Sequence, residues 1–129
     1  MDKKRKNFII SILRRGSYKW SARNEALQKA KEQSGSFSTG RPKYKYRCSK
    51  CNELFMKKDI CLDHIDPVIP LEWICDDDFD WNIYLDRMYC QAIGFQVLCS
   101  SCHDIKTKEE NEIRTTNKRE FREAKKAKN

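Results

Sequence analysis

Residues 95–107 read FQVLCSSCHDIKT, a short apolar run followed directly by a Cys-x-x-Cys pair and a histidine. The apolar residues predict a strand, and the residues from Cys99 to about Arg114 predict a helix. Two cysteines separated by two residues can present both thiolates to one ion. The stretch therefore indicates a metal site at a strand-to-helix junction.

A second Cys-x-x-Cys pair lies upstream, so the two pairs together supply four thiolates: Cys48, Cys51, Cys99 and Cys102. This is the ligand set of a closed structural zinc site, which has no open position for catalysis. Seven cysteines and no recognisable export signal favour reduced thiolates over disulfides, and a cytoplasmic location is expected. The remaining cysteines are predicted to be small buried apolar residues: Cys61, Cys75 and Cys90.

The rest of the central region divides into short elements. Alternating residues over 44–55 predict a β-hairpin around the first cysteine pair. Residues 60–65 predict a strand that ends before Pro67, because proline cannot donate to a sheet. Apolar residues recur at helical spacing over 81–89, which predicts a helix packed by that face.

The N-terminal region predicts two helices, one over about Asn7–Arg15 and one that begins after an N-cap at Ser21 and stops at a Ser/Gly-rich linker over 34–42. The fold class is α+β. Its predicted parts are a basic helical arm over residues 1–43, a compact domain over 44–114 and a basic tail over 115–129.

Charge follows the same division. Residues 1–47 carry 14 Lys or Arg and 3 Asp or Glu, residues 48–113 carry 6 and 14, and residues 114–129 carry 7 and 2. Basic flanks attract a polyanion and interior carboxylates attract a cation, as in a metal-dependent enzyme that acts on nucleic acid, although solvated helices and tails would carry the same charges. The apolar run near the start is too short to cross a membrane, so no membrane partner is expected.

Both histidines of the chain lie beside these motifs. His64 stands in CLDHIDP at residues 61–67, and His103 follows the second cysteine pair. The order Cys-x-x-Cys, Asp-His-Ile-x-Pro and Cys-x-x-Cys-His over residues 44–110 resembles the HNH endonucleases, in particular the small stand-alone HNH proteins of bacteriophages.

The resemblance implies a ββα-metal (His-Me finger) core with strands around Asp63–His64 and Gly94–Leu98 and a helix that begins near Cys99. It implies that His64 is the general base and that Asp63 and His103 are ligands of a catalytic divalent ion such as Mg²⁺, Mn²⁺ or Ni²⁺. The four paired cysteines would hold a structural Zn²⁺. A histidine suits the role of base because its ordinary pKa is about 6.5.

Two features qualify how these residues act together. Neighbouring side chains in a strand point to opposite faces, so Asp63 and His64 are expected to serve one site only at the strand's end, and Asp66 or Glu72 are alternative carboxylates. The family motif has an asparagine where this chain has Gly94. That asparagine ties the loop of the catalytic histidine, and Gln96 is the nearest side chain that could compensate.

The resemblance also implies the partners. Double-stranded DNA would be nicked or cut on both strands. By analogy with small phage HNH proteins, the protein would either assist a phage terminase in DNA packaging or act as a mobile endonuclease. The candidate phosphate contacts are basic: Arg14, Arg15, Lys43, Lys45 and Lys106. The alternative is a noncatalytic zinc-knuckle protein that binds nucleic acid, a decayed HNH protein in which both histidines are structural.

Overall fold

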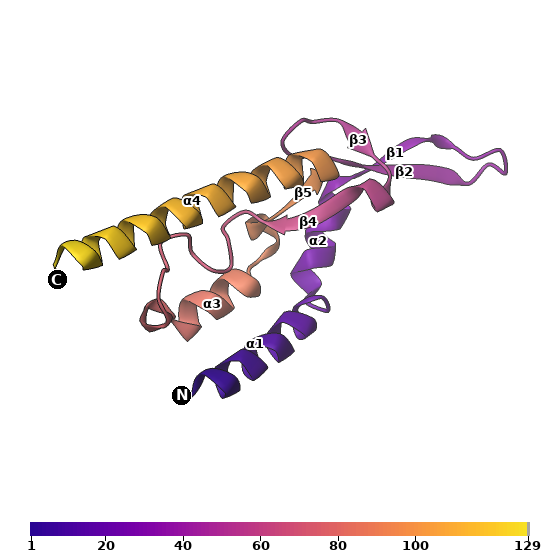
Figure 1. Cartoon of the computed structure of the whole chain (residues 1–129). Coiled ribbons are helices and arrows are strands. Elements are labelled where there is room, and N and C mark those ends of the chain that lie inside the picture. Colours follow the sequence, from indigo (N-terminus) through magenta and orange to yellow (C-terminus); the bar gives the residue numbers. More distant parts are fainter. Residues whose placement is uncertain (129) are drawn as a thin grey trace.

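The computed structural model describes residues 1–128, and they form an α+β fold of four helices and two small antiparallel sheets (Figure 1). In chain order the elements are α1 (Lys3–Ser17), α2 (Ser21–Ala30), β1 (Lys31–Ser36), β2 (Pro42–Arg47), β3 (Leu54–Phe55), β4 (Ile60–His64), α3 (Trp81–Met88), β5 (Phe95–Cys99) and α4 (Ser100–Ala127). None of the helices in this range is long and apolar enough to cross a membrane.

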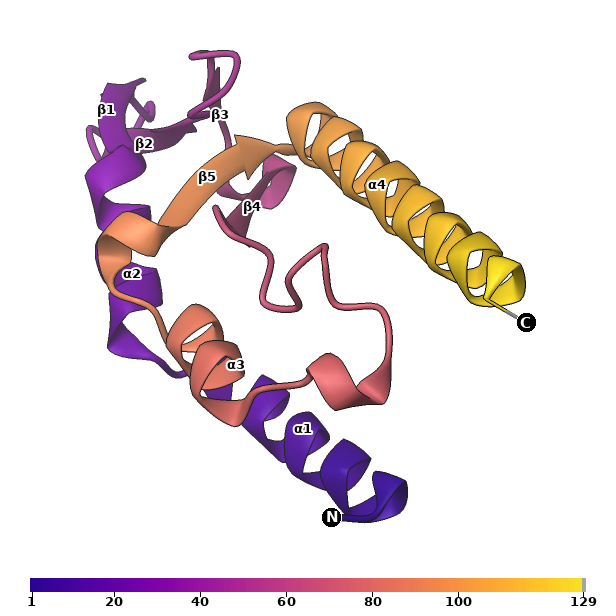
Figure 2. The ribbon, with the colours of Figure 1, turned by 90° about the vertical axis from the view of Figure 1, so that its left-hand side faces the viewer.

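The two-stranded sheet of β4 and β5 is the centre of the molecule. The strands run antiparallel with Ile60 opposite Cys99 and His64 opposite Phe95. The sheet lies between α2 and the start of α4 (Figure 2). Every residue of β5 except Gln96 is buried, because α2 and α4 cover its two faces. The predicted strands at 60–65 and 95–98 are confirmed.

The second sheet has the order β1-β2-β3, and the β2–β3 hairpin encloses the first cysteine pair as predicted. The structure corrects the region before it. The helix begun at Ser21 ends at Ala30 instead of continuing to residue 33, and the predicted linker at 34–42 is the end of β1 and its turn. β1 has few strand-forming residues, and its pairing is set by β2 and by the Glu32–Arg47 ion pair across the strands. The predicted boundary at residue 43 therefore falls inside β2.

The N-terminal helices are packed against and hydrogen-bonded to the central region of the fold. Ala22 and Ala26 of α2 share a buried cluster with Ala92 and Phe95. The Trp20 indole donates to the carbonyl of Cys90 at 2.6 Å, and the Tyr89 hydroxyl donates to the carbonyl of Leu13 at 2.5 Å. These contacts fix α1 and α2 on the same side of β4.

The C-terminal helix is longer than expected. The predicted tail at 115–129 is, over its described residues, a continuation of α4 to Ala127. Arg114 donates to the carbonyl of Ile69 at 2.8 Å, and Asn117 donates to the carbonyl of Leu71 at 3.0 Å. These bonds hold α4 against the loop after β4 as far as Asn117.

Helix α3 confirms the predicted packing face over 81–89, since Tyr84 and Met88 are buried. The expectation for the three unpaired cysteines is wrong in part. Cys61 and Cys90 are half-buried, and Cys75 is exposed. Cys75 precedes a short acidic turn at Asp76–Asp78 that contains no buried residues, so no packing covers its thiol.

Candidate metal centre and histidine site

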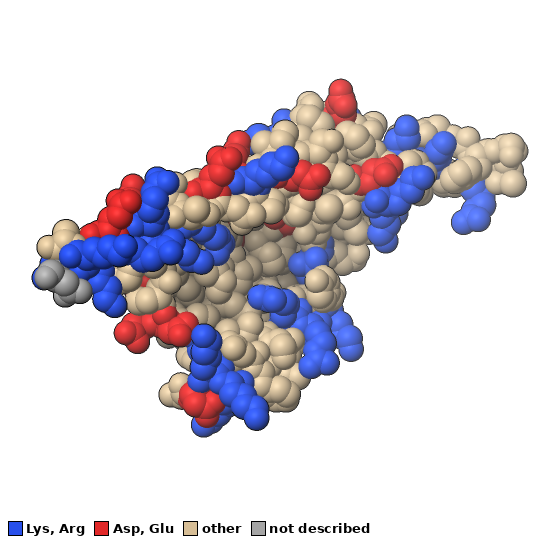
Figure 3. Space-filling model, in the orientation of Figure 1, with Lys and Arg blue, Asp and Glu red and all other residues tan. Residues whose placement is uncertain are grey.

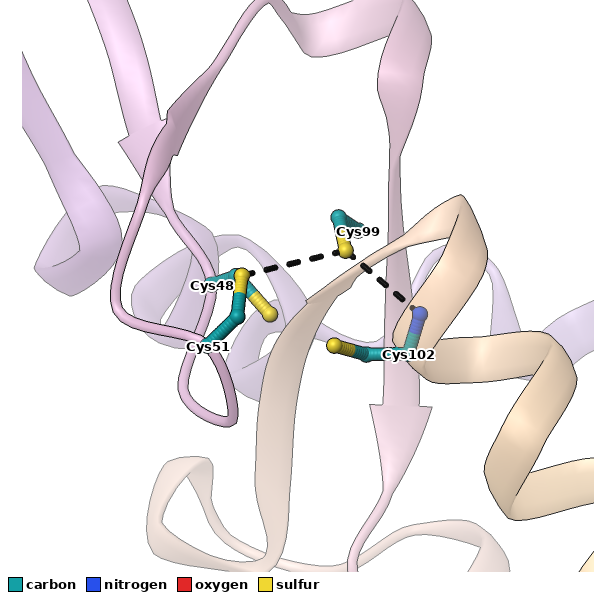
Figure 4. A group of neighbouring side chains, drawn as sticks. All are labelled: Cys48, Cys51, Cys99 and Cys102. Carbon is teal, nitrogen blue, oxygen red and sulfur yellow. Dashed lines mark hydrogen bonds between the residues drawn. The ribbon is translucent and has the colours of Figure 1, made fainter.

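The sulfurs of the four paired cysteines lie within 4.8 Å of one another: Cys48, Cys51, Cys99 and Cys102. They point toward a common centre from the β2–β3 turn and from the junction of β5 and α4 (Figure 4). A tetrahedral zinc with Zn–S bonds of about 2.3 Å separates its sulfurs by about 3.8 Å. The four thiolates therefore fit an ion such as zinc, which confirms the metal site predicted from the spacing.

Local backbone geometry holds the first cysteine pair in place. Asn52 adopts φ 64°, a left-handed conformation that asparagine tolerates better than most residues, and its N–H donates to the carbonyl of Cys48 at 2.9 Å. Ser49 N–H donates to the carbonyl of Val97 at 2.8 Å, which ties the turn to β5. This bond brings the two cysteine pairs together although they are distant in sequence.

The thiols ionise unequally. Burial raises the pKa of Cys48, but backbone N–H groups around the turn outweigh it and lower the pKa to about 6. The hydrogen bond with Cys99, followed by burial, raises the pKa of Cys102 to about 12. Four thiolates this close together repel one another, so a cation at their centre would stabilise their negative charges.

On the α4 face of β4, Asp63 meets three side chains. Its Oδ1 lies 3.9 Å from Nε2 of His103, and its Oδ2 accepts hydrogen bonds from Gln96 at 3.1 Å and from Lys106 at 2.9 Å. Lys106 also contacts Glu110 at 2.5 Å and donates to the carbonyl of His64 at 3.0 Å. Burial opposes the charge on Lys106, but these carboxylates raise its pKa, so the ammonium is retained.

The Asp63–His103 pair has the donors of a divalent-ion site but a wider spacing. A carboxylate oxygen and an imidazole nitrogen are ligands of Mn²⁺ and Ni²⁺, whereas 3.9 Å exceeds the roughly 3.0 Å between adjacent octahedral ligands at bonds of about 2.1 Å. Oδ1 faces His103, while Oδ2 is held by Gln96 and Lys106. The ammonium of Lys106 supplies positive charge at the same carboxylate, so it would compete with an ion bound there.

His64 lies on the opposite face of β4, as strand alternation requires. Its Nε2 is 3.0 Å from the carbonyl of Met88, and its ring stacks 4.8 Å from the ring of Phe95. A carbonyl only accepts, so Nε2 carries the proton in the neutral ring and Nδ1 has the free lone pair. Burial lowers the pKa of His64. The hydrogen bond with the Met88 carbonyl opposes this shift, and the charges of Arg23 and Asp63 have smaller effects that lower and raise the pKa, respectively.

Gly94, in place of the expected asparagine, takes part in holding this strand end. A Cβ at Gly94 would lie 2.6 Å from Sγ of Cys90, so no larger residue fits. Its carbonyl accepts from the N–H of Ile65 at 2.9 Å, directly after His64. A backbone hydrogen bond therefore ties the residue after His64 to Gly94, and the Gln96 amide orients Asp63.

The other predicted phosphate contacts and the alternative carboxylates lie in different parts of the structure. Arg14 lines a cleft beside His64, whereas Arg15 is an exposed residue of α1. Lys43 and Lys45 lie on β2, where Lys43 stands 5.6 Å over the ring of Phe37. The alternative carboxylates are both exposed, and Glu72 lies in a surface pocket beside Asn117.

One residue around this strand end was missed in the sequence. Glu110 follows Lys106 by four positions, a helical spacing that the sequence displays. Arg23 was expected only as a general phosphate contact and Met88 only as a packing residue, and their position beside His64 had no sequence signal, because it arises from tertiary packing.

Comparisons of the chain with models of protein families, with curated proteins and with solved structures found no match.

Proposed function

We propose that this protein is a metal-dependent HNH endonuclease that hydrolyses phosphodiester bonds of double-stranded DNA, with β4, β5 and α4 as a ββα-metal core. One observation carries the proposal. Asp63 and His103 approach each other across β4 and the first turn of α4, and His64 ends the same strand. The four-cysteine cluster sits at the other end of the sheet and supplies stability.

His64 is the general base. Its Nε2–H is held by the carbonyl of Met88, so Nδ1 accepts the proton of the attacking water. Because burial lowers the pKa of His64, the ring is neutral and ready to accept a proton at pH 7. The water oxygen forms the new bond to phosphorus, and the bond from phosphorus to the 3′ oxygen breaks.

Asp63 and His103 would hold the divalent ion, which supplies charge stabilisation to the scissile phosphate and the leaving oxygen. Gln96 fixes the Asp63 carboxylate through its hydrogen bond to Oδ2. An ion at Asp63 would displace the Lys106 ammonium from the carboxylate, and Lys106 would then be available to a neighbouring phosphate.

A plasmid-nicking assay with Mg²⁺, Mn²⁺ or Ni²⁺ tests the proposal. His64→Ala is expected to lower the nicking rate by roughly 10²- to 10⁴-fold, because that is the usual contribution of a positioned general base. The variant should keep its zinc and its thermal unfolding temperature, which controls for misfolding. The proposal fails if wild-type protein nicks with none of the ions, or if the variant nicks equally fast.

A second candidate is a noncatalytic zinc-stabilised protein that binds nucleic acid. The observation that favours it is the Lys106 ammonium on Asp63, which neutralises the carboxylate without an ion. In that case DNA binding persists and depends on salt, but no ion induces nicking and Mn²⁺ does not bind at Asp63.

A further inference from the structure

A cleft of about 320 Å³ opens beside His64, on the face of β4 opposite Asp63. Four separate segments contribute to its wall, with Arg14 and Tyr18 from α1, Arg23 from α2, His64 from β4 and Met88 from α3. Although the chain has 19 Asp and Glu, none lines this cleft. Two arginines and a histidine converge on a space without carboxylates, which is the composition of an anion site.

Arg23 is held rigidly at this cleft. It is half-buried, with its guanidinium carbon 5.1 Å from the ring centre of Tyr18 and 5.4 Å from that of Phe95. Phe95 in turn packs 4.8 Å from the His64 ring. A guanidinium that stacks on aromatic rings keeps its N–H donors free at its edge. Within residues 1–128 Arg23 forms no ion pair, so its charge is not neutralised by the protein.

Arg14 approaches from the other helix. The Tyr89–Leu13 hydrogen bond fixes α1 one residue before Arg14. Tyr84 has a buried hydroxyl with no hydrogen bond in the described part of the chain, and burial raises its pKa while the charge of Arg14 lowers it. Arg14 is therefore close to Tyr84 and also lines the cleft.

Lys and Arg side chains also gather on this face of the molecule. Between α4 and α1 the molecule is hollowed, with Lys and Arg side chains along both borders and Asp and Glu side chains beside them at one end (Figure 3). A nucleic-acid strand in this hollow would pass the end of β4.

We propose that Arg14, Arg23 and His64 form a pocket for one backbone phosphodiester of a nucleic acid, so that α1 and α2 complete the active site. The inference deepens the proposed function and rests on it for one point, that the bound phosphate is the one cleaved, which requires this phosphate to extend past the end of β4 toward Asp63 and His103 on the opposite face. Arg23 provides two N–H donors to the phosphate oxygens and Arg14 a second positive charge. His64 stands beside the same phosphate with Nδ1 free.

The pocket is tested first by binding without cleavage. The side-chain Nε–Hε resonances of Arg14 and Arg23 are followed by NMR while the dinucleotide TpT is added without a divalent ion. Both resonances should shift together, and that of Arg15, exposed on the same helix, should not. Equal shifts at all three arginines, or none at Arg23, overturn the pocket.

Substitution tests the role in the reaction. Arg23→Gln and Arg14→Gln should weaken binding of a short duplex by roughly 10- to 100-fold, the effect of losing a hydrogen bond to a charged group, whereas Arg15→Gln should change it by less than about threefold. Arg23→Lys keeps the charge and the stem but loses the two-pronged contact, so it should retain the unfolding temperature and still lower kcat more than it raises KM.

The results separate the two proposals. If TpT shifts both arginines but the protein nicks with no ion, the phosphate pocket stands and the nuclease assignment fails. If wild-type protein nicks and Arg23→Lys and Arg14→Gln keep full kcat, the nuclease assignment stands and the pocket is wrong. A loss in Arg23→Gln that is matched by Arg15→Gln also overturns the pocket, because general charge would then explain it.

Discussion

The four-cysteine cluster and the Asp63–His64 pair occupy opposite ends of the β4–β5 sheet, and they are built in opposite ways. In the cluster, like groups from two short turns converge on one point. At the other end, unlike neighbours in one strand diverge, with Asp63 toward α4 and His64 toward α1 and α2. The difference teaches that each cysteine pair is set by a local motif, whereas the surroundings of Asp63 and His64 come from the whole fold.

The largest expected effect comes from breaking the cluster. Cys99→Ser removes one of four thiolates, and because structural zinc contributes about 10–16 kcal/mol of binding free energy, the variant should lose its cooperative unfolding transition. Circular dichroism melting and metal analysis measure this, with about one zinc per wild-type chain. Cys75→Ser, at an exposed cysteine outside the cluster, is the control and should match the wild type. A folded, zinc-free Cys99→Ser protein would refute the structural role.

Gly94 accepts a hydrogen bond from Ile65 at the His64 end of β4, and substitution there should cause a smaller loss of stability. Gly94→Ala places a Cβ 2.6 Å from Sγ of Cys90, and this overpacking should cost about 1–3 kcal/mol of unfolding free energy. Denaturant unfolding measures the change. The double variant with Cys90→Ala removes the nearest clash and should recover part of it. Unchanged stability in Gly94→Ala would mean that Cys90 moves freely and that the backbone tie is loose.

The Lys106 ammonium and a divalent ion would compete for the Asp63 carboxylate, which gives a prediction for metal affinity. Lys106→Met removes an ammonium 2.9 Å from the carboxylate, so Mn²⁺ should bind about fivefold more tightly, the scale of a partly exposed ion pair. Isothermal titration calorimetry measures the affinity, and Asp63→Asn should abolish the binding. Lys108→Met, exposed on the same helix, should leave the affinity unchanged. Weaker binding in Lys106→Met would show that the lysine supports the ion site.

The smallest expected effect concerns pH. The folded pKa of His64 lies below 6.5, and the reactive form is the neutral ring. The nicking rate should therefore change less than about twofold between pH 7 and 8, and fall as pH drops below the folded pKa. A single-turnover pH profile at saturating ion tests this. A rate that rises tenfold from pH 7 to 8 would assign the limiting proton transfer to another group.

Much of the fold followed from local pattern. The strands at 60–65 and 95–98, the hairpin around the first cysteine pair and the helix over 81–89 were predicted because their apolar residues alternate or recur at helical spacing. The pairing of β1 and the length of α4 were not. β1 is formed by a polar segment that pairs with β2, and α4 extends to Ala127, with Arg114 and Asn117 bound to the loop after β4.

The sequence by itself determined the metal cluster and the placement of Asp63, His64 and His103 along the chain, because two-residue spacings and strand alternation are local geometry. Only the tertiary structure decided what surrounds each of them. Lys106 and Gln96 converge on Asp63, and Arg23 and Met88 on His64, from segments far apart in sequence. The backbone carbonyl that orients His64 and the rings that hold Arg23 come from packing, which no spacing along the chain encodes.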